Sequence, residues 1–396
     1  MNTTNKIKAF ASVFLLVIAV QIIKADDDAG RSEFNAVTVS VPSLTIAPDA
    51  RGGGMGDIGA ATEPDMASQY WNPAKNAFAY SKAGVTFSYT PWLRSLVNDI
   101  DLVYLSGFYK VGDPELGTIG ASLRYFSLGS ISITTESGQE MTQVNPYEMA
   151  IDAGYSLKLS EKFSIGANIR FIYSDMGTNV TGASDLQPGY ALAADLAGYY
   201  NNYVMMGNNE CLLGLGFNLS NMGTKISYDG GNTTYFIPTN LRLGASFLFP
   251  MDDYNTLSFN VDANKYMVPT PPDMQGLSAE EKSEALKRYR ETSPIAGIFK
   301  SFSDAPGGAK EEFREIMWSL GAEYAYNNQF FVRGGYFYEN PYKGNRQYFS
   351  LGVGFKMTAF QLDAAYLIST VPSNPLDQTL RFSLTFDMDG LKGLVR

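Results

Sequence analysis

Residues 163–174 read FSIGANIRFIYS and alternate apolar with small or polar side chains along most of their length. Successive side chains on a β-strand point to opposite faces, so this segment would be apolar on the Phe163 face and largely polar on the Arg170 face. In a soluble sandwich the apolar face would pack on a core. In an outer-membrane barrel it would face lipid, and the polar face would line the lumen. The stretch therefore predicts a strand, and its surroundings must distinguish the two folds.

The same alternation recurs from about Gly84 to Phe386 and predicts fourteen strands, an even number that suits a single-chain bacterial barrel. Gaps after even-numbered strands are short, the longest being 200–209, and gaps after odd-numbered strands are generally long. A sandwich has no reason to sort its connections in this way. We therefore expect an all-β outer-membrane barrel of about fourteen antiparallel strands, with short turns and both termini in the periplasm and long loops outside. The expected lipid-facing residues include Phe163, Leu243, Phe382 and Leu384. The expected strands lie near 84–91, 101–111, 117–127, 148–158, 163–174, 190–199, 210–218, 240–249, 255–264, 318–326, 330–338, 347–355, 360–368 and 378–386.

The N-terminal residues 1–25 have the features of a secretory signal peptide. Two lysines precede an apolar run over 9–23, and a small residue, Ala25, precedes three aspartates. The apolar run is too short for a typical spanning helix, which makes a retained anchor the weaker alternative. We accordingly expect a signal peptide (1–25), an N-terminal periplasmic or plug segment (26–83) and a transmembrane barrel (84–396).

The composition excludes several classes of chemistry. The chain has no histidine and a single cysteine, Cys211. It therefore lacks the side chains for Ser-His-Asp or Cys-His catalysis, for His-ligated zinc and for thiolate metal sites, although carboxylate-pair and Ser-Lys chemistry stay open. The net charge of −10 argues against a nucleic-acid partner, because phosphate binding needs a basic surface. We expect no catalytic residue, no metal and no cofactor.

Charged residues recur on the polar, lumen-facing side of the expected strands, and their sign nearly alternates from strand to strand. Opposite charges on neighbouring strands stabilise a sheet, whereas like charges directly opposite destabilise it. Two strands carry glycines on this face instead, including Gly214, Gly216, Gly352 and Gly354. The pattern predicts a filled lumen, and the alternative is a set of separately solvated charges. The expected lumen ion-pair belt comprises Arg124, Asp152, Arg170, Asp195, Arg242, Asp262, Glu323, Arg333, Asp363 and Arg381.

The segment before the first expected strand is rich in glycine and ends in Trp-Asn-Pro-Ala at 71–74. Gly54, Gly56 and Gly59 have the spacing of the dinucleotide-binding GxGxxG motif. However, no convincing strand precedes them, and Pro64 interrupts the helix that should follow. We expect these glycines to allow a tight backbone path inside the barrel mouth.

The run ARGGGMGDIGAATEPDMASQYWNPAKNAFAY, residues 50–80, resembles the N-terminal signature of the PorV/PorQ proteins of the type IX secretion system. Those proteins in turn resemble the FadL-type fourteen-stranded transporters, whose N-terminal segment also contains Asn-Pro-Ala and folds into the barrel. The Trp-Asn-Pro-Ala context and the overall length favour PorV over PorQ. The plug motif that carries the likeness comprises Gly54, Gly56, Asp57, Trp71, Asn72 and Pro73.

The resemblance implies a non-enzymatic component of that secretion system in the outer membrane. Such a barrel would contact membrane lipid and the translocon, bind secreted cargo through its C-terminal signal domain, and pass it to the sortase complex for attachment to lipopolysaccharide. The FadL likeness implies an alternative, a transporter of hydrophobic compounds with a continuous apolar pocket. A third possibility, an enzyme that modifies lipopolysaccharide acyl chains, would have to work without histidine.

Residues 265–317 form the longest expected external loop. Ser278 and Glu281 have the spacing of a capping box, which predicts a helix inside the loop. Loops of this length are usually functional or disordered, and here the alternatives are a lid on the barrel and a surface that binds a partner. The candidate partner-binding residues in this loop and in 219–239 are Tyr228, Asn232, Tyr235, Leu286, Tyr289, Phe299 and Phe313.

Overall fold

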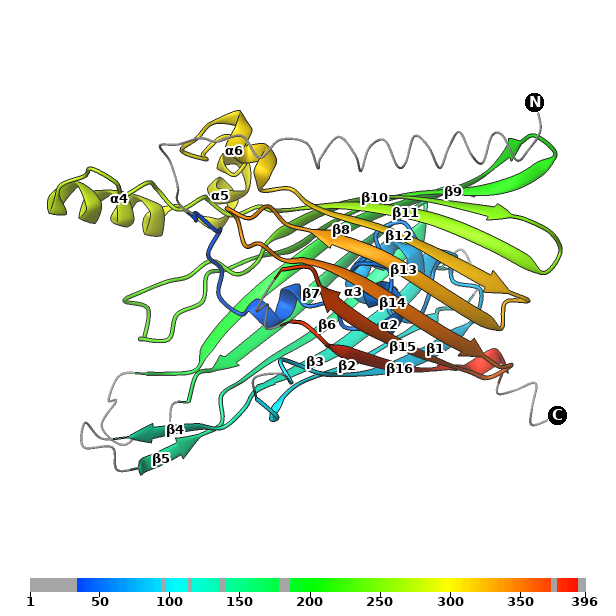
Figure 1. The fold of residues 1–396 in the computed structure, drawn as a ribbon, viewed down its shortest axis with the longest axis horizontal. Helices are drawn as coiled ribbons and strands as arrows, with labels where there is room; N and C mark the ends of the chain where they lie inside the picture. Colours follow the sequence, from blue (N-terminus) through cyan, green and yellow to red (C-terminus); the bar gives the residue numbers. More distant parts are fainter. Residues whose placement is uncertain are drawn as a thin grey trace.

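The computed structural model describes residues 34–94, 97–112, 116–134, 140–177, 186–371 and 376–390, and these residues form one closed antiparallel barrel of fourteen strands (Figure 1). The predicted fold class is therefore confirmed, while the predicted signal peptide lies outside the described residues. Strands β1 and β16 pair to close the barrel. The barrel strands are β1 (Ala83–Pro91), β2 (Ile100–Lys110), β3 (Thr118–Leu128), β6 (Tyr147–Lys158), β7 (Phe163–Asp175), β8 (Gly189–Met206), β9 (Asn209–Gly223), β10 (Asn240–Pro250), β11 (Asn255–Tyr266), β12 (Met317–Tyr326), β13 (Phe330–Tyr338), β14 (Gln347–Lys356), β15 (Phe360–Ser369) and β16 (Leu380–Asp387).

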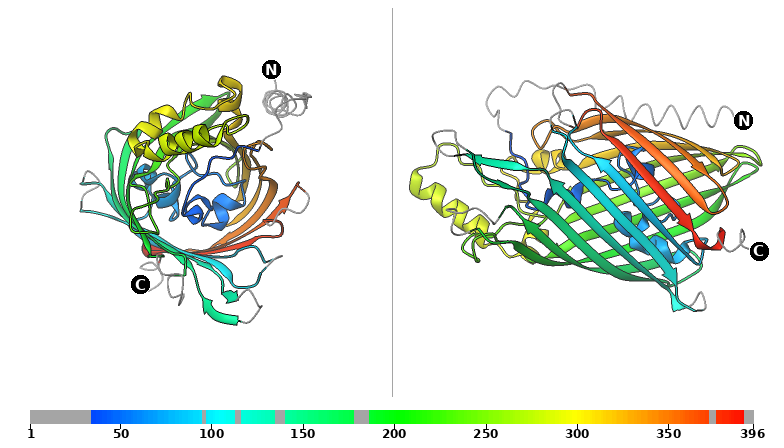
Figure 2. Two further views of the ribbon diagram at one scale, coloured as in Figure 1. Left: turned by 90° about the vertical axis from the view of Figure 1, so that its left-hand side faces the viewer. Right: turned by 90° about the horizontal axis from the view of Figure 1, so that it is seen from below.

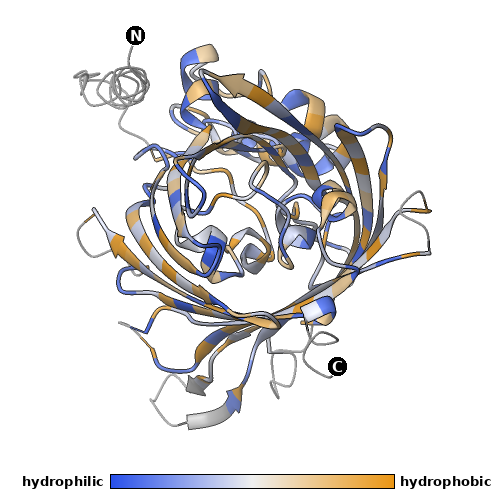
Figure 3. Ribbon diagram, turned by 90° about the vertical axis from the view of Figure 1, so that its right-hand side faces the viewer, coloured by the Kyte–Doolittle hydropathy of each residue, from blue (hydrophilic) through white to orange (hydrophobic). Residues whose placement is uncertain are grey.

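Alternation of side chains gives the barrel two different faces, as the hydropathy colouring of Figure 3 shows along the strands. On β16, Phe382 points outward and is 42% exposed, whereas its neighbour Arg381 points inward and is 2% exposed. Leu243 on β10 is 50% exposed. Phe163 and Leu384 are half-buried and share the outward phase of their strands. The outer wall is thus apolar and the inner wall polar, as an outer-membrane barrel requires.

Two predicted connections contain more strand than the sequence pattern suggested. The expected gap at 200–209 is wrong, because β8 and β9 continue to Met206 and from Asn209 and pair across a tight turn. Gly207 occupies that turn with φ +69°, a conformation that glycine adopts without strain. Within the expected 128–147 loop, β4 (Ile131–Thr134) and β5 (Glu140–Val144) form a separate two-stranded sheet.

The connections separate by length between the two ends of the barrel, as predicted. The end at the right of Figure 1, here called the turn end, holds the last residues of β16 and the connections 111–117, 159–162, 207–208, 251–254, 327–329 and 357–359. The opposite end, the loop end, holds the connections 92–99, 129–146, 176–188, 224–239, 267–316, 339–346 and 370–379. No helix among the described residues is long and apolar enough to cross a membrane.

Residues 34–82, here called the plug, run through the lumen from the loop end to the turn end (Figure 2). At the loop end Asn35 N donates to Tyr342 O over 2.9 Å, and at the turn end the chain enters β1 at Ala83. The expected position of both termini concerns residues outside the described ranges; the first described residues lie at the end opposite to the last residues of β16. The plug contains η1 (Pro42–Thr45), α2 (Ala50–Gly53), α3 (Ser68–Trp71) and η2 (Pro73–Phe78).

The β11–β12 connection forms a helical excursion that lies over part of the loop-end mouth (Figure 2). Its helices are α4 (Ala279–Glu291), α5 (Pro294–Lys300) and α6 (Ala309–Arg314). The capping box is present, because Ser278 Oγ accepts from Glu281 N and Ser278 N donates to a Glu281 carboxylate oxygen. The predicted helix is therefore confirmed.

Candidate functional site

The Trp-Asn segment of the plug folds the plug on itself and attaches it to the wall. Trp71 is fully buried, and its Nε1 donates to Asp49 Oδ1 over 2.6 Å. Asn72 Nδ2 donates to the carbonyls of Ala60 at 2.8 Å and of Gly198 on β8 at 3.0 Å. Each of these buried polar side chains has a hydrogen-bond partner in the protein, so its burial is compensated.

Three other motif residues of the plug contact the wall formed by β13–β16, whereas Pro73 lies next to Gly166 on β7. Asp57 pairs with Arg381 on β16, with 2.9 Å between Oδ1 and Nη1. Gly56 has φ +81°, which favours glycine, and a Cβ at Gly54 would lie only 3.0 Å from the backbone of β14. Pro73 begins η2, where a missing N–H costs nothing. The glycines therefore permit close packing of plug on wall; no dinucleotide turn is formed.

One buried ion cluster joins three neighbouring strands. Arg170 on β7 lies between Asp195 on β8, at 2.8 Å, and Asp152 on β6, at 3.2 Å. Gln69 of the plug donates to Asp152 over 2.8 Å, and Arg170 also contacts Asn221. Since all three charges are buried, the cluster depends on this full set of partners.

A second cluster lies on the wall formed by β12–β15. Arg333 on β13 pairs with Glu323 on β12 at 2.5 Å and reaches across β14 to Asp363 on β15 at 2.6 Å. The reach depends on Gly354, because a Cβ there would lie 2.9 Å from Arg333 Nη1. Arg51 of the plug adds a further pair to Glu323 at 2.9 Å. This cluster therefore connects the wall directly to the plug.

The remaining belt residues bind the plug and do not form cross-strand ion pairs. Arg124 Nη1 donates to the Ser43 carbonyl, and Arg242 Cζ lies 4.6 Å from the centroid of the Trp71 ring. Asp262 accepts the backbone N–H groups of Gly59 and Ala60, each over 2.9 Å. Arg381, described above, pairs with Asp57. The belt expected from the sequence is thus divided into two ion clusters and four plug-binding side chains.

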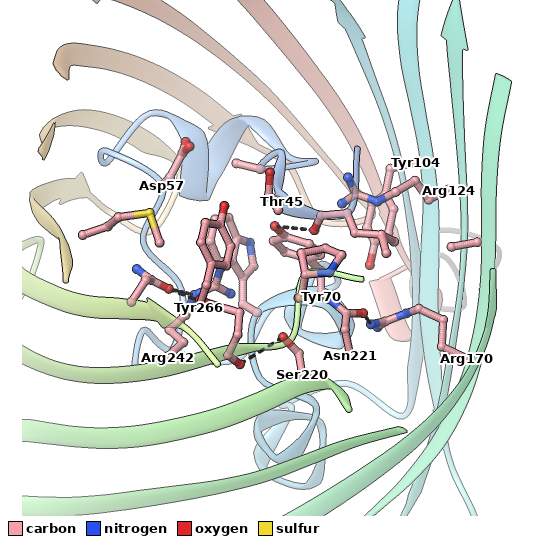
Figure 4. A pocket seen from close by; sticks show the side chains of 18 of the residues that line it. Thr45, Asp57, Tyr70, Tyr104, Arg124, Arg170, Ser220, Asn221, Arg242 and Tyr266 are labelled. Atoms are coloured by element: carbon pink, nitrogen blue, oxygen red, sulfur yellow. Dashed lines mark hydrogen bonds between the residues drawn. The ribbon is translucent and has the colours of Figure 1, made fainter. Parts of the chain in front are cut away.

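Two cavities lie on either side of the plug. The loop-end cavity, of about 60 Å³, is lined by four arginines and by aromatic rings (Figure 4). The turn-end cavity, of about 540 Å³, has a mixed lining that includes Arg51, Asp363, Phe108 and Phe331. The two cavities share no lining residue.

Buried ion pairs hold the last helix of the excursion against the barrel rim. Lys265 at the end of β11 contacts Glu315 and pairs with Glu312 at 3.0 Å. Lys343 pairs with Glu315 at 2.9 Å and with Glu311 at 2.5 Å. Although partial burial acts to raise it, the interaction with Lys343 lowers the pKa of Glu311 below its usual value. No spacing in the sequence indicates these long-range pairs, and the sequence reasoning missed them.

Five of the seven predicted partner-binding residues are exposed at the loop end. Two others serve the barrel itself: Tyr228 Oη lies 3.0 Å from both Ser40 and Ser174 hydroxyls, and the Tyr289 ring packs against Phe236 with centroids 5.7 Å apart. Tyr228 therefore links the start of the plug to β7, and Tyr289 packs α4 against the 224–239 connection. The exposed five are Asn232, Tyr235, Leu286, Phe299 and Phe313.

Two exposed apolar residues beside Phe299 were missed. Ile295 lies one helical turn before Phe299 on α5, and Phe302 follows just beyond the end of that helix. Ile295 is 70% exposed and Phe299 72% exposed. Ser293 caps α5 and Pro294 is its first residue, a signal that could have located this helix from the sequence. We call Ile295, Phe299, Phe302 and Phe313 the loop-end apolar surface.

The described residues contain no group of three or more Cys, Asp or Glu side chains arranged to hold a metal ion. The most perturbed amine is Lys75 of η2, which is fully buried and donates to Thr62 Oγ1 over 2.9 Å. Burial lowers the pKa of Lys75 to about 8, although Asp65 acts in the opposite direction. Lys75 is enclosed by the plug, so it contributes to plug packing and offers no open reactive group.

A closed fourteen-stranded barrel with an apolar outer wall, filled by its own N-terminal segment, is a plugged barrel of the bacterial outer membrane. The particular family follows from comparison with known families. The family model described as type IX secretion system protein PorV matches residues 29–273, and the chain belongs to this family. It is therefore an outer-membrane protein of type IX secretion.

Comparison with individual proteins gives more distant likenesses. None of the curated proteins matches the chain. Among solved structures, the toluene transporter TbuX of Ralstonia pickettii is 12% identical with a TM-score of 0.44, over 86% of this chain and 97% of that one. The toluene transporter TodX of Pseudomonas putida is 12% identical with a TM-score of 0.46, over 90% and 98%. A FadL homologue of Pseudomonas aeruginosa is 13% identical with a TM-score of 0.41, over 90% and 100%.

Proposed function

We propose that this barrel is a non-enzymatic cargo carrier of type IX secretion. It receives secreted proteins at the translocon through their C-terminal signal domain and delivers them to the sortase attachment complex. In this proposal the loop end faces the cell exterior, and the turn end with the last residues of β16 faces the periplasm. The first described residues, which lie at the loop end, would then be external.

The observation that carries the proposal is the loop-end apolar surface. Four large apolar side chains project from an excursion whose last helix is fixed to the rim by buried ion pairs. Exposed apolar patches of this kind typically mark protein-binding sites, and aromatic side chains often dominate the binding energy. The fixed helix supports a preformed surface, which lowers the entropy lost on binding.

The filled lumen supports the same proposal. The plug crosses the lumen from end to end and bonds to both ion clusters, so the barrel offers no open path for a folded or extended protein. A carrier that binds cargo at its mouth needs no such path. The transporter alternative predicts a continuous apolar pocket; the turn-end cavity favours it in size, but its lining contains Arg51, Glu323, Arg333 and Asp363.

The test replaces the surface while keeping the barrel. The triple variant Ile295→Ser, Phe299→Ser, Phe302→Ser should assemble normally, because all three side chains are exposed. Cells that carry it should lose most cargo from the surface and accumulate it elsewhere. Ile131→Ser is the control, since Ile131 is also an exposed apolar residue but lies on the separate β4–β5 sheet.

Full surface attachment by a well-assembled triple variant would contradict the proposal. Heat-modifiable migration of the variant shows whether the barrel has assembled. Purification with bound fatty acid and without cargo would instead support the transporter.

A further inference from the structure

Two arginines of the loop-end cavity, one of them buried, have no ion-pair partner within the described part of the chain. Four arginines line it, but only Arg170 and Arg346 make ion pairs, Arg346 with Glu339 at 2.8 Å. Arg124 and Arg242 make none within 4 Å among the described residues. Arg124 is 3% exposed, so its charge is held away from bulk water without a carboxylate. Burying an unpaired charge is costly, which makes Arg124 unusual.

Aromatic rings hold both guanidinium groups in place. Arg124 Cζ lies 4.8 Å and Arg242 Cζ 5.4 Å from the centroid of the Tyr70 ring, so one tyrosine of the plug contacts both cations (Figure 4). Cation–π contacts stabilise a guanidinium without satisfying its N–H groups. Arg124 Nη1 already donates to the Ser43 and Ile46 carbonyls, and Arg242 Nε donates to Asn264 Oδ1, which leaves Arg124 Nη2 as the buried donor that an incoming ligand can use.

Buried polar atoms without a partner line the same cavity. Tyr104 and Arg124 are directly opposite each other on β2 and β3. The Tyr104 hydroxyl, Arg124 Nη2 and Asn240 Oδ1 are all buried, and none has a hydrogen-bond partner among the described residues. Buried polar groups in native proteins are nearly always satisfied, so three of them around one cavity mark a site for a polar molecule. Two of the three, the hydroxyl and Nη2, are donors.

We infer that the loop-end cavity is a binding site for a single carboxylate group. A guanidinium and a neighbouring hydroxyl match the two oxygens of a carboxylate, and Arg242 supplies a second positive charge. The volume of about 60 Å³ suits a carboxylate and its first carbons, since one water needs roughly 10–15 Å³ of such space. The lining residues Pro238, Asn240, Tyr266 and Arg346 all lie at the loop end, so a carboxylate would enter from that side.

The carboxylate could belong to a free peptide C-terminus or to a short fatty acid. The test uses the purified full barrel in a non-ionic detergent and isothermal titration calorimetry, so it does not depend on the cargo-carrier proposal. The probes are N-acetyl-trialanine as the free acid, the same peptide as its C-terminal amide, octanoate, and inorganic phosphate. We expect one acid probe or both to bind saturably, and the amide and phosphate to bind far more weakly. Binding of the peptide acid alone identifies a peptide end as the ligand, and binding of octanoate alone identifies a fatty acid.

Variants assign the binding to the cavity. Arg242→Gln and Arg124→Gln should each weaken acid binding roughly tenfold or more, the range expected for a charge-assisted hydrogen bond. Arg288→Gln on α4, whose side chain is exposed, is the control and should bind as the wild type. Tyr104→Phe removes only the unpartnered hydroxyl and should weaken binding several-fold, which keeps the test open if Arg124→Gln fails to assemble.

Three results would overturn the inference. They are no saturable binding of either acid to the wild type, equal binding of the peptide acid and amide, and unchanged acid binding by assembled Arg242→Gln and Tyr104→Phe variants. Preferential binding of phosphate would also contradict it, because the site would then not be selective for a carboxylate.

Discussion

Oppositely charged residues form pairs both in the lumen and on helix α4 of the excursion, but the lumen pairs are buried and the α4 pairs are exposed. In the lumen, Arg170 and its two aspartates are buried, and each aspartate lies within 3.2 Å of the guanidinium group. On α4, Lys287 and Glu291 are 3.9 Å apart and remain largely exposed. When one partner of a buried pair is removed, the remaining charge stays buried and has no water to solvate it. In an exposed pair the remaining charge is solvated by water, so the loss costs little. The comparison shows that the interior charges fix the plug, while those on α4 leave that helix free of such constraint.

The largest effect is expected for Arg170→Ala. Asp152 and Asp195 would then be buried without a cation, and the free energy of unfolding should fall by roughly 3–5 kcal/mol. Urea titration of heat-modifiable migration measures the loss. Replacing Asp152 and Asp195 by Asn in the same chain should restore part of the stability, and a double-mutant cycle gives the coupling. Additive effects would mean that these charges act independently.

A smaller effect, with a pH signature, is expected at Lys75. Its folded-state pKa of about 8 lies below the usual 10.5, so the charged amine is penalised in the folded barrel below pH 8. The penalty of about 3 kcal/mol fades as the pH rises from 8 to 10.5, and wild-type stability should rise over that window. Lys75→Met should be more stable than the wild type at pH 7 and should lack the rise. A parallel pH profile for wild type and variant would contradict this account.

A local effect is expected for Glu315→Gln. Glu315 is 5% exposed and pairs with two lysines at the rim, so neutralising it should weaken the attachment of α6 by roughly 1–3 kcal/mol. The barrel should stay assembled while the excursion becomes more sensitive to protease. Proteolysis of intact cells measures this, and unchanged cleavage of 294–314 would mean that the rim pairs do not hold the excursion.

The smallest effect is expected for Lys287→Ala, which removes the exposed pair with Glu291. Exposed helix pairs contribute about 0.3–0.5 kcal/mol, so neither stability nor surface attachment should change measurably. A loss comparable to that of Arg170→Ala would remove the distinction between interior and surface pairs.

The sequence predicts the barrel well because the period of two and the sorting of loop lengths are local properties of the chain. The same period of two also predicts that all ten belt residues face the lumen. The ends of β8 and β9 were missed because residues 201–206 lack a clear apolar alternation and are in register with β9 alone. The plug contacts could not be predicted, since Asp262 binds backbone N–H groups that leave no mark in the sequence. The contacts of Tyr228 and Tyr289 could not be predicted for a related reason: their partners come from distant parts of the chain.

The central claim, that cargo binds at the loop end, is tested most directly by photo-crosslinking in living cells. A photoreactive amino acid would replace Phe299 in the loop-end apolar surface or Met357 at the turn end, both of which are exposed. The carrier account predicts adducts with secreted proteins from position 299 and none from position 357. Cargo adducts from position 357 with none from position 299, in assembled barrels, would contradict it.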